Sequence, residues 1–264
     1  MSNCVALPMY DVYPPATDAL WAALRPLLKE QGITQEITFT RPSHLFEHWQ
    51  DDALLLSQTC GYPLTTQLPD VQTVGCFHYS APGCKGPFYR SFLVARAEDK
   101  GKTLADFQER TAVCNAVDSH SGYNALRKMV AQLGSPSRFF RDVTFSGGHK
   151  ASLLALQQKS ADITAVDCVT FALLQRHQPA LLAGLTLIEE TPLAPGLPLI
   201  TSRRTAPDTL LALRSALQQL VSEPGLRATC AAALIQGFSP VSREDYEVML
   251  QWQREAAVAG VDAL

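Results

Sequence analysis

Two short segments place hydroxyl, imidazole and glycine residues where a strand is expected to run into a helix. They are residues 118–123 (DSHSGY) and residues 146–149 (SGGH), the second followed by Ser152. A helix N-terminus presents unpaired backbone N–H groups, and serine and histidine side chains add further donors, so both segments can bind an oxyanion. The alternative is that the serines only cap their helices. His149 could likewise be only a surface histidine near a helix start.

A carboxylate occupies a comparable position later in the chain. Asp167 ends the apolar run of residues 163–166 (ITAV), and the carboxyl ends of parallel strands are where ligand-contacting groups are found. The alternative is that Asp167 is the N-cap of the following helix. Lys150, beside His149, could add a full positive charge to the second segment.

Residues 44–48 (HLFEH) fit HxxEH, the pattern of inverted zincins. Histidines at i and i+4 share one face of a helix, but Pro42 and Ser43 leave room for barely two turns, and no third carboxylate follows at a recognisable spacing. We therefore expect no metal site there. The chain also lacks a GxSxG elbow, a Walker loop and GxGxxG, so no motif indicates an enzyme class.

Cysteine usage favours reduced thiols. The chain has seven cysteines, an odd number, and no CxxC pair, so most are interpreted as small buried hydrophobic residues. Cys76 and Cys84 are the exception, because both fall in a Gly/Pro-rich segment that also holds His78. A disulfide or a metal role for this pair is left open, although two thiols and one imidazole lack a fourth ligand.

Composition excludes several classes of function. The 264 residues carry 22 Lys and Arg against 25 Asp and Glu, a formal charge of −3. Without a basic run or stripe, a nucleic-acid partner is not expected. No stretch approaches 18 consecutive apolar residues, so no membrane span is predicted. Residues 1–8 (MSNCVALP) lack the features of a signal peptide. The expectation is a cytoplasmic chain, unless a leader has been removed.

Short apolar runs alternate with amphipathic stretches along the chain, a pattern typical of βα units and a parallel sheet. In the first part, strands are predicted at residues 4–8, 33–40 and 53–56, and helices at 18–31, kinked at Pro26 and closed by Gly32, and at 43–50, capped by Ser43. Further strands are predicted at 88–95, 112–117, 142–145, 163–166 and 199–202, and helices at 121–133, 150–159 and around 210–221. Residues 75–87 and 191–198 are Gly/Pro-rich and are predicted to be linkers between two domains.

Taken together, these segments resemble the phosphate/phosphite/phosphonate-binding family of ABC-transporter solute-binding proteins, which has the type II periplasmic-binding-protein fold. The resemblance runs over most of the chain, and its specificity lies in the order and spacing of short pieces. The pieces are residues 8–10 (PMY), 86–91 (GPFYRS), 118–123 (DSHSGY), 147–152 (GGHKAS), 161–167 (ADITAVD), 237–241 (GFSPV) and 245–246 (DY).

This resemblance implies a two-domain α/β fold, each domain a central sheet flanked by helices, with the ligand cleft between them. Domain 1 would comprise residues 1–91 and 197–264, and domain 2 residues 92–196. The resemblance implies a hinge that closes when an oxyanion-bearing ligand such as a phosphonate or phosphate binds, without turnover. It implies no metal and no cofactor, and the expected protein partner is an ABC-transporter permease. The chain is expected to be monomeric, and by family the location would be periplasmic.

The resemblance also implies the ligand-binding residues. The anion site would be formed by Ser119, His120, Ser121 and His149, together with the ring hydroxyl of Tyr89. Asp167 would accept a hydrogen bond from an amine or from a protonated phosphoryl oxygen, and would thereby reject sulfate. From domain 1, the residues that would close over the ligand are Tyr10, Gln58 and Thr59.

Two departures from the family pattern keep alternatives open. His120 stands where a hydroxyl residue is usual, so the site loses one O–H donor and gains an imidazolium or a steric plug. The missing leader is the second departure. A cytoplasmic relative would be a sensor that docks onto a partner protein, or an enzyme acting on a phosphorylated or pyrimidine-like cofactor precursor. In such an enzyme, catalysis would fall to His120, His149 or Cys60.

Overall fold

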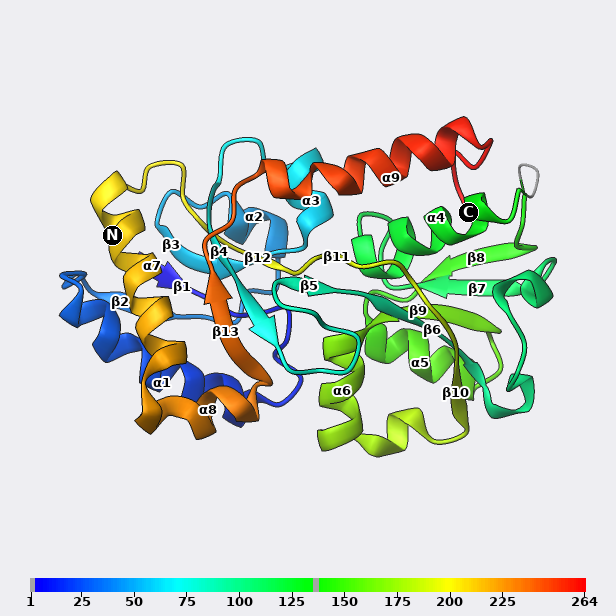
Figure 1. Cartoon of the computed structure of the whole chain (residues 1–264), viewed down its shortest axis with the longest axis horizontal. Coiled ribbons are helices and arrows are strands. Elements are labelled where there is room, and N and C mark those ends of the chain that lie inside the picture. The colour runs from blue at the N-terminus through cyan, green and yellow to red at the C-terminus, as the bar shows by residue number, and fades with distance from the viewer. Residues whose placement is uncertain (1–2, 135–137) are drawn as a thin grey trace. The chain divides into compact units, whose positions relative to one another are not determined.

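The computed structural model describes residues 3–134 and 138–264, and the chain folds as two units (Figure 1). Unit 1 is Met1–Phe88 with Pro195–Tyr246, and unit 2 is Tyr89–Ala194 with Glu247–Leu264. Met1 and Ser2, the start of the N-terminal stretch considered above, lie outside the described residues. Among the described residues, no helix combines the length and the apolar composition that crossing a membrane requires.

Unit 1 contains a six-stranded sheet in the order β13-β4-β12-β3-β1-β2. The strands are β1 (Asn3–Val5), β2 (Ile37–Phe39), β3 (Leu54–Gln58), β4 (Gln72–Tyr79), β12 (Pro198–Thr201) and β13 (Ile235–Ser239). β1 is parallel to β2 and β3, whereas β12 and β13 are antiparallel to their neighbours. The sheet is therefore mixed, with the parallel pairs that the βα pattern indicates at β1, β2 and β3 and antiparallel pairs at β12 and β13.

Helices complete unit 1. They are α1 (Pro14–Glu30), α2 (Leu45–Trp49), α3 (Gly61–Thr66), α7 (Pro207–Ser222) and α8 (Arg227–Ala232), with 3-10 turns at Pro224–Leu226 and Glu244–Tyr246. The predicted face of α1 is buried at Leu20, Leu24, Leu27 and Leu28, and the helix passes through Pro26. Gly32 follows the C-cap at a φ of +86°, a conformation that favours glycine. Ser43 does not cap α2, whose N-cap is His44 without a side-chain bond.

Residues 75–87 are not a linker throughout, because the segment up to Tyr79 belongs to β4. Gly75 lies within that strand, and a Cβ placed on it would lie 2.2 Å from the Phe238 ring and 2.7 Å from the Ser239 carbonyl oxygen. The glycine is thus required for close approach of β13, not for a flexible connection. The pair β5 (Phe88–Tyr89) and β11 (Ala194–Pro195) forms at the two positions where the chain first leaves and then returns to unit 1.

Unit 2 contains a five-stranded sheet in the order β10-β6-β9-β7-β8. The strands are β6 (Ser91–Arg96), β7 (Thr111–Cys114), β8 (Asp142–Phe145), β9 (Ile163–Asp167) and β10 (Leu185–Glu190). β7, β8 and β9 are parallel, as predicted for the middle block, and β6 and β10 are antiparallel. The helices are α4 (Ala125–Gln132), α5 (His149–Gln157), α6 (Cys168–His177) and α9 (Glu247–Val258), with 3-10 turns at Ala97–Asp99, Leu104–Phe107 and Pro179–Leu182.

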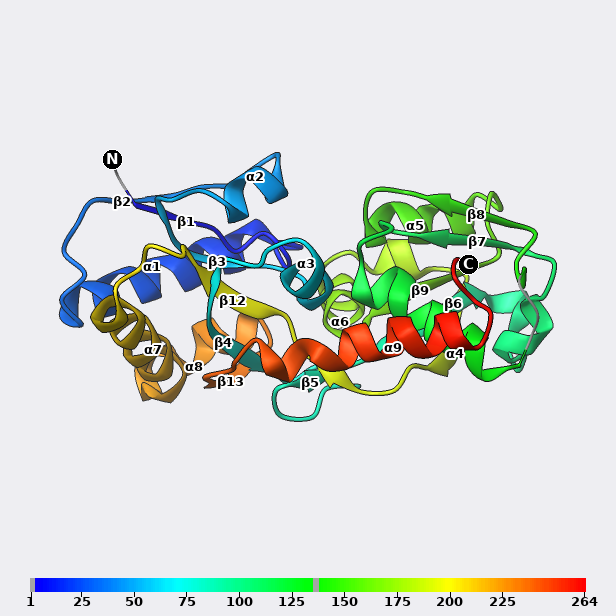
Figure 2. The ribbon, with the colours of Figure 1, turned by 90° about the horizontal axis from the view of Figure 1, so that it is seen from above.

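The C-terminal segment lies in unit 2, so the expectation that residues 197–264 return whole to the first domain differs from the structure. α9 runs alongside α4 (Figures 1 and 2). Ala256 and Val261 are buried in the core of unit 2, and Arg127 donates to the carbonyl oxygens of Gln253 and Asp262 at 3.1 and 2.9 Å. This third passage of the chain, after Tyr246, carries no proline or glycine that would have marked it in the sequence.

Candidate anion-binding site

The parallel strands of unit 2 each run into a helix at the same edge of the sheet. β7 leads through residues 115–119 into a π-helical turn (His120–Asn124) that continues as α4, β8 leads into α5, and β9 leads into α6. The Ser146 and Gly147 backbone N–H groups donate to the carbonyl oxygens of Cys114 and Asn115, both at 2.9 Å. These bonds hold the β7 and β8 exits together, so the two segments singled out in the sequence become neighbours.

Ser119 is the N-cap of the first helix. Its Oγ accepts the Gly122 backbone N–H at 3.1 Å and lies 3.5 Å from Ser121 Oγ. The plain capping interpretation thus applies to Ser119. A Cβ on Gly122 would lie 1.8 Å from Asn115 Oδ1, so this turn needs glycine to let Asn115 approach.

His149 joins the second segment to the first. It is the first residue of α5, after a turn in which Gly147 has a φ of +86°. Its Nε2 lies 3.1 Å from Ser121 Oγ and 3.4 Å from Asp167 Oδ2. Burial lowers the pKa of His149, and the Asp167 carboxylate only partly opposes that shift. The imidazole is therefore neutral at pH 7, and the surface-histidine alternative does not hold for a side chain that is 12% exposed.

Asp167 has two structural contacts. Oδ1 accepts the Thr170 backbone N–H at 2.8 Å, which makes Asp167 the N-cap of α6, and Oδ2 faces His149. The carboxylate is 4% exposed. Capping and proximity to the site are thus not alternatives at this residue, because each uses a different oxygen.

His120 is buried in unit 2, with 1% of its surface exposed. Its ring centroid lies 5.0 Å from that of Trp252 and 6.4 Å from that of Tyr89, and its Nδ1 lies 3.1 Å from Asn124 Nδ2. Burial lowers the pKa of His120 to about 3. Of the two alternatives left open for His120, an imidazolium or a steric plug, the imidazolium is not supported, because burying the charge is costly.

Side-chain contacts in unit 2 connect four of the predicted residues, which are Ser119, Ser121, His149 and Asp167. His120 lies between the two serines in the chain, and its ring contacts the ring of Tyr89, which ends β5 and is 2% exposed.

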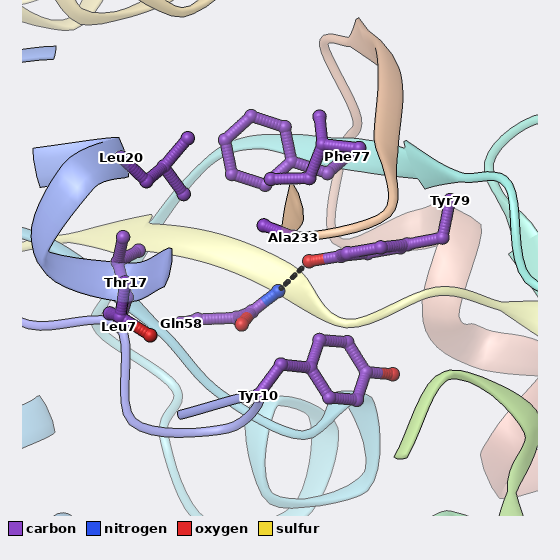
Figure 3. A pocket seen from close by; sticks show the side chains of 9 residues that line it. Leu7, Tyr10, Thr17, Leu20, Gln58, Phe77, Tyr79 and Ala233 are labelled. Carbon is purple, nitrogen blue, oxygen red and sulfur yellow. Dashed lines mark hydrogen bonds between the residues drawn. The ribbon is translucent and has the colours of Figure 1, made fainter. Parts of the chain in front are cut away.

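The other three predicted residues lie in unit 1, where Tyr10 and Gln58 line a small pocket (Figure 3) and Thr59 does not. Gln58 ends β3 and donates from Nε2 to the Tyr79 hydroxyl at 3.1 Å, and the Tyr10 ring meets the Tyr79 ring edge-on at 5.0 Å. Thr59 is fully buried, and its backbone N–H donates to the Pro198 carbonyl oxygen. The pocket, of about 30 Å³, also contacts Leu7 and Phe77. Such a volume holds about two water molecules, not an organic ligand.

Catalytic constellations receive no support from the geometry. Ser121, His149 and Asp167 are together, but both partners face the same ring nitrogen, whereas a Ser-His-Asp relay uses both. His44 precedes α2, and His48 Nε2 is 3.0 Å from Ser57 Oγ. Within the described part of the chain, no group of three or more His, Cys, Asp and Glu residues could hold a metal ion. The cysteines there, including Cys76 and Cys84, are free thiols.

Three further residues at these places were missed in the sequence. Asn124 could have been found, since it lies one helical turn beyond His120. Trp252 could not, because it reaches His120 from a helix more than a hundred residues away. Tyr79 fell inside a segment that was interpreted as a linker.

Residues 79–246 match the family model described as "ABC transporter, phosphonate, periplasmic substrate-binding protein". This match covers more than half of the chain. The chain belongs to this family. The resemblance found in the sequence is thereby confirmed, as is the function class of a substrate-binding protein of phosphonate-type ABC transporters. Among curated protein sequences, none matches this chain.

Solved structures support the same fold for this phosphonate-family chain. A binding protein of an ABC phosphonate transporter from Pseudomonas aeruginosa is 16% identical, with a TM-score of 0.78 over 98% of this chain and 87% of that one. PhnD1 from Prochlorococcus marinus, in complex with methylphosphonate, is 14% identical, with a TM-score of 0.78 over 98% and 99%. The alkanesulfonate-binding protein SsuA from Xanthomonas axonopodis, bound to MOPS, is 15% identical, with a TM-score of 0.66 over 100% and 96%. The expected type II periplasmic-binding-protein fold is thus confirmed.

Proposed function

We propose that this substrate-binding protein binds a singly protonated phosphonate or a phosphate-like oxyanion, without turnover, for delivery to an ABC-transporter permease in the periplasm. The observation that carries the proposal is the grouping of Ser121, His149 and Asp167 at helix N-termini of unit 2. A helix N-terminus and a hydroxyl favour an anion, and a buried carboxylate beside them favours an anion that still carries a proton.

The energies are sufficient for useful affinity. A hydrogen bond to a charged group contributes roughly 1.5–3 kcal/mol, and a micromolar dissociation constant corresponds to about 8 kcal/mol. Four or five such donors contribute roughly 6–15 kcal/mol, a range that includes this value, before the cost of ordering the ligand and protein is subtracted. The Ser121 hydroxyl, the backbone N–H groups at the starts of the π-helical turn (His120–Asn124) and of α5, and the ring N–H groups of His120 and His149 supply that number.

Asp167 gives the proposal its selectivity. A phosphonate monoanion or hydrogen phosphate can donate its P–O–H proton to Asp167 Oδ2, whereas a sulfonate or sulfate at neutral pH has no proton to donate. The Asp167 carboxylate would then receive no hydrogen bond from the ligand and would lie beside its negative charge. Because both groups are poorly solvated there, their repulsion costs several kcal/mol. This reasoning favours phosphonates over the sulfonates that SsuA represents among the structural neighbours.

The test is calorimetric titration with matched pairs of ligands, methylphosphonate against methanesulfonate and phosphate against sulfate. We expect binding only of the phosphorus ligands, with their 31P spectra unchanged after prolonged incubation. The Asp167→Asn variant keeps an oxygen to cap α6 and should shrink the preference for methylphosphonate at least tenfold. Equal binding of methanesulfonate by the wild-type protein would contradict the selectivity, and a new 31P signal would contradict binding without turnover.

For the residues of unit 1, only the sequence resemblance supports a role in ligand binding. Tyr10, Gln58 and Thr59 are predicted to contribute to binding, and the structure gives Gln58 and Tyr10 defined partners around Tyr79. Gln58→Ala should therefore weaken binding of methylphosphonate if the prediction holds. Gln67→Ala, at an exposed position after α3, is the control.

A further inference from the structure

The amide of Asn124 has its orientation fixed by a carbonyl oxygen of α9. Asn124 is 1% exposed, and its Nδ2 lies 3.0 Å from the Met249 carbonyl oxygen. A carbonyl oxygen only accepts, so the amide nitrogen and not the amide oxygen must face Met249. The –NH₂ group has a second hydrogen, and the atom within reach of it is His120 Nδ1, at 3.1 Å.

This arrangement determines where the proton of His120 resides. An imidazole nitrogen that accepts a hydrogen bond carries no proton, and the neutral ring then has its proton on the other nitrogen. Nδ1 of His120 is the acceptor, so Nε2 carries the hydrogen. The ring contacts the side chains of Trp252, Tyr89 and Asn124, and none of these bears a charge at neutral pH.

We propose that Asn124 is a positioning residue of the anion site, which holds His120 as the Nε2–H tautomer so that the ring acts as a neutral hydrogen-bond donor to the bound oxyanion. The donor role rests on the proposed function. It accounts for a histidine between Ser119 and Ser121, where a ring N–H takes the place of a hydroxyl donor. The lowered pKa of His120 means that this donor is unaffected by pH in the neutral range.

Helix α9 provides the groups that orient the side chains of Asn124 and His120. Met249 and Trp252 lie three residues apart on α9, so that one turn of the helix provides both the carbonyl oxygen for Asn124 and the ring beside His120. α9 is in turn held to α4 by the ion pair of Lys128 and Glu255 and by Arg127. The C-terminal helix therefore determines the chemistry of a turn that lies far away in sequence.

The first test uses the wild-type protein with ¹⁵N-labelled histidine. Long-range ¹⁵N–¹H spectra distinguish a protonated from an unprotonated ring nitrogen without any substitution. We expect His120 as the Nε2–H tautomer from pH 5 to pH 8, both free and with saturating methylphosphonate, with the Nε2 resonance shifting when the ligand binds. An Nδ1–H tautomer, an imidazolium, or an unshifted Nε2 resonance in the bound protein would each overturn the proposal.

The second test compares Asn124→Ala with Gln132→Ala, an exposed amide on the same helix. Asn124→Ala should give His120 a mixture of tautomers and weaken methylphosphonate binding at least fivefold, whereas Gln132→Ala should change neither. Retention of the pure Nε2–H tautomer in Asn124→Ala would exclude a positioning role. Thermal unfolding of both variants shows whether a loss of binding comes from a loss of folding. If Asn124→Ala does not fold, the ¹⁵N–¹H spectra of the wild-type protein decide whether His120 is the Nε2–H tautomer.

The two proposals fail differently. Binding of methylphosphonate by a wild-type protein whose His120 has the wrong tautomer overturns the positioning role and leaves the proposed function standing. Failure to bind phosphonate or phosphate overturns the proposed function and the donor role together, even if the tautomer is as expected.

Discussion

At the scale of single residues, the anion site that we propose in unit 2 consists of neutral donors and one carboxylate. His120 and His149 are both buried, and burial lowers the pKa of each. A lysine in their place would attract any anion alike, because its charge acts without regard to whether the ligand carries a proton. Neutral donors with one acceptor instead distinguish ligands by their protons, which is the selectivity that we propose for Asp167.

Ser121 is the hydroxyl with which this can be tested most directly. Its Oγ is within hydrogen-bonding distance of His149, and it is not the group that caps the helix. Ser121→Ala should weaken methylphosphonate binding by roughly 1–3 kcal/mol, the usual cost of removing one partner of a buried charged group. Calorimetry measures this loss, and Ser160→Ala, at an exposed position of unit 2, is the control. An unchanged affinity in Ser121→Ala would exclude this hydroxyl from the site.

His120 also predicts how stability depends on pH. Its pKa is about 3 in the folded chain and 6.5 as the ordinary value, so only the unfolded chain takes up a proton between these values. Stability from this residue is complete above pH 6.5 and declines as pH falls toward 3. Between pH 7 and pH 5 the free energy of unfolding should fall by about 2 kcal/mol on account of His120.

Urea denaturation at pH 7 and at pH 5 measures that fall. His120→Gln should remove the part due to this residue, whereas His44→Gln, at an exposed position, should keep it. His149 contributes a decline of the same sign, because its pKa is also lowered. A pH dependence that is equal in wild type and His120→Gln would show that His120 is protonated in the folded chain.

At the scale of elements, two packing contacts cannot be seen in the sequence. They are the contact of β4 with β13 and the contact of α9 with α4. Strand β4 pairs with β12 on one side and β13 on the other, and α9 packs on α4 in the other unit. Gly75 allows the first contact and Arg127 holds the second. In most sequences a glycine indicates a loop and an arginine indicates the surface, so neither residue indicates packing.

Gly75→Ala should destabilise the protein by roughly 1–3 kcal/mol, because the new methyl group meets the Phe238 ring and the backbone of β13 and must displace the strand. Chemical denaturation measures the loss. Gly225→Ala in the same unit meets no atom within 4 Å and should have little effect. If both substitutions are equally tolerated, β13 does not pack on β4 at the distance described.

Arg127 should hold the end of α9. Arg127→Met keeps the apolar stem but removes the donors to Gln253 and Asp262, so the free energy of unfolding should fall by roughly 1–3 kcal/mol. Backbone hydrogen exchange should become faster mainly between residues 253 and 262. Arg254→Met, at an exposed position of α9, should leave both unchanged, and exchange that is no faster in Arg127→Met would contradict the assignment.

Local pattern was informative where an element packs through its own periodicity. The apolar face of α1 was predicted correctly, because the helical spacing of its leucines is visible in the segment itself. Residues 142–145 form a strand as predicted, although Phe145 is exposed. The segment 75–87 was misinterpreted because glycine for close approach and glycine for flexibility look the same in a sequence. The candidate anion site shows the same difference between local and distant information. Its serines, histidines and Asp167 were found from strand-to-helix positions, whereas Trp252 and Met249 come from a distant helix.

At the scale of the whole molecule, the chain passes three times between the units, after Phe88, Ala194 and Tyr246. Three connections leave fewer relative motions open to the two units than one connection would, and hinge closure stays a prediction. The sequence predicted two linkers and hinge closure. The third connection leads directly into α9, whose Trp252 contacts His120. A hinge motion at this connection would therefore act on a helix that contacts a residue of the proposed anion site.

Closure is therefore expected when the site is occupied. Small-angle scattering of the wild-type protein should show a smaller radius of gyration with saturating methylphosphonate than without it, and methanesulfonate at the same concentration should leave the curve unchanged. The Ser121→Ala variant should close to the same extent once its ligand concentration is raised in proportion to its weaker affinity, because the hydroxyl serves binding and not the hinge. A scattering curve that stays the same at confirmed saturation would mean that binding occurs without closure, since calorimetry of the same sample reports occupancy independently of shape.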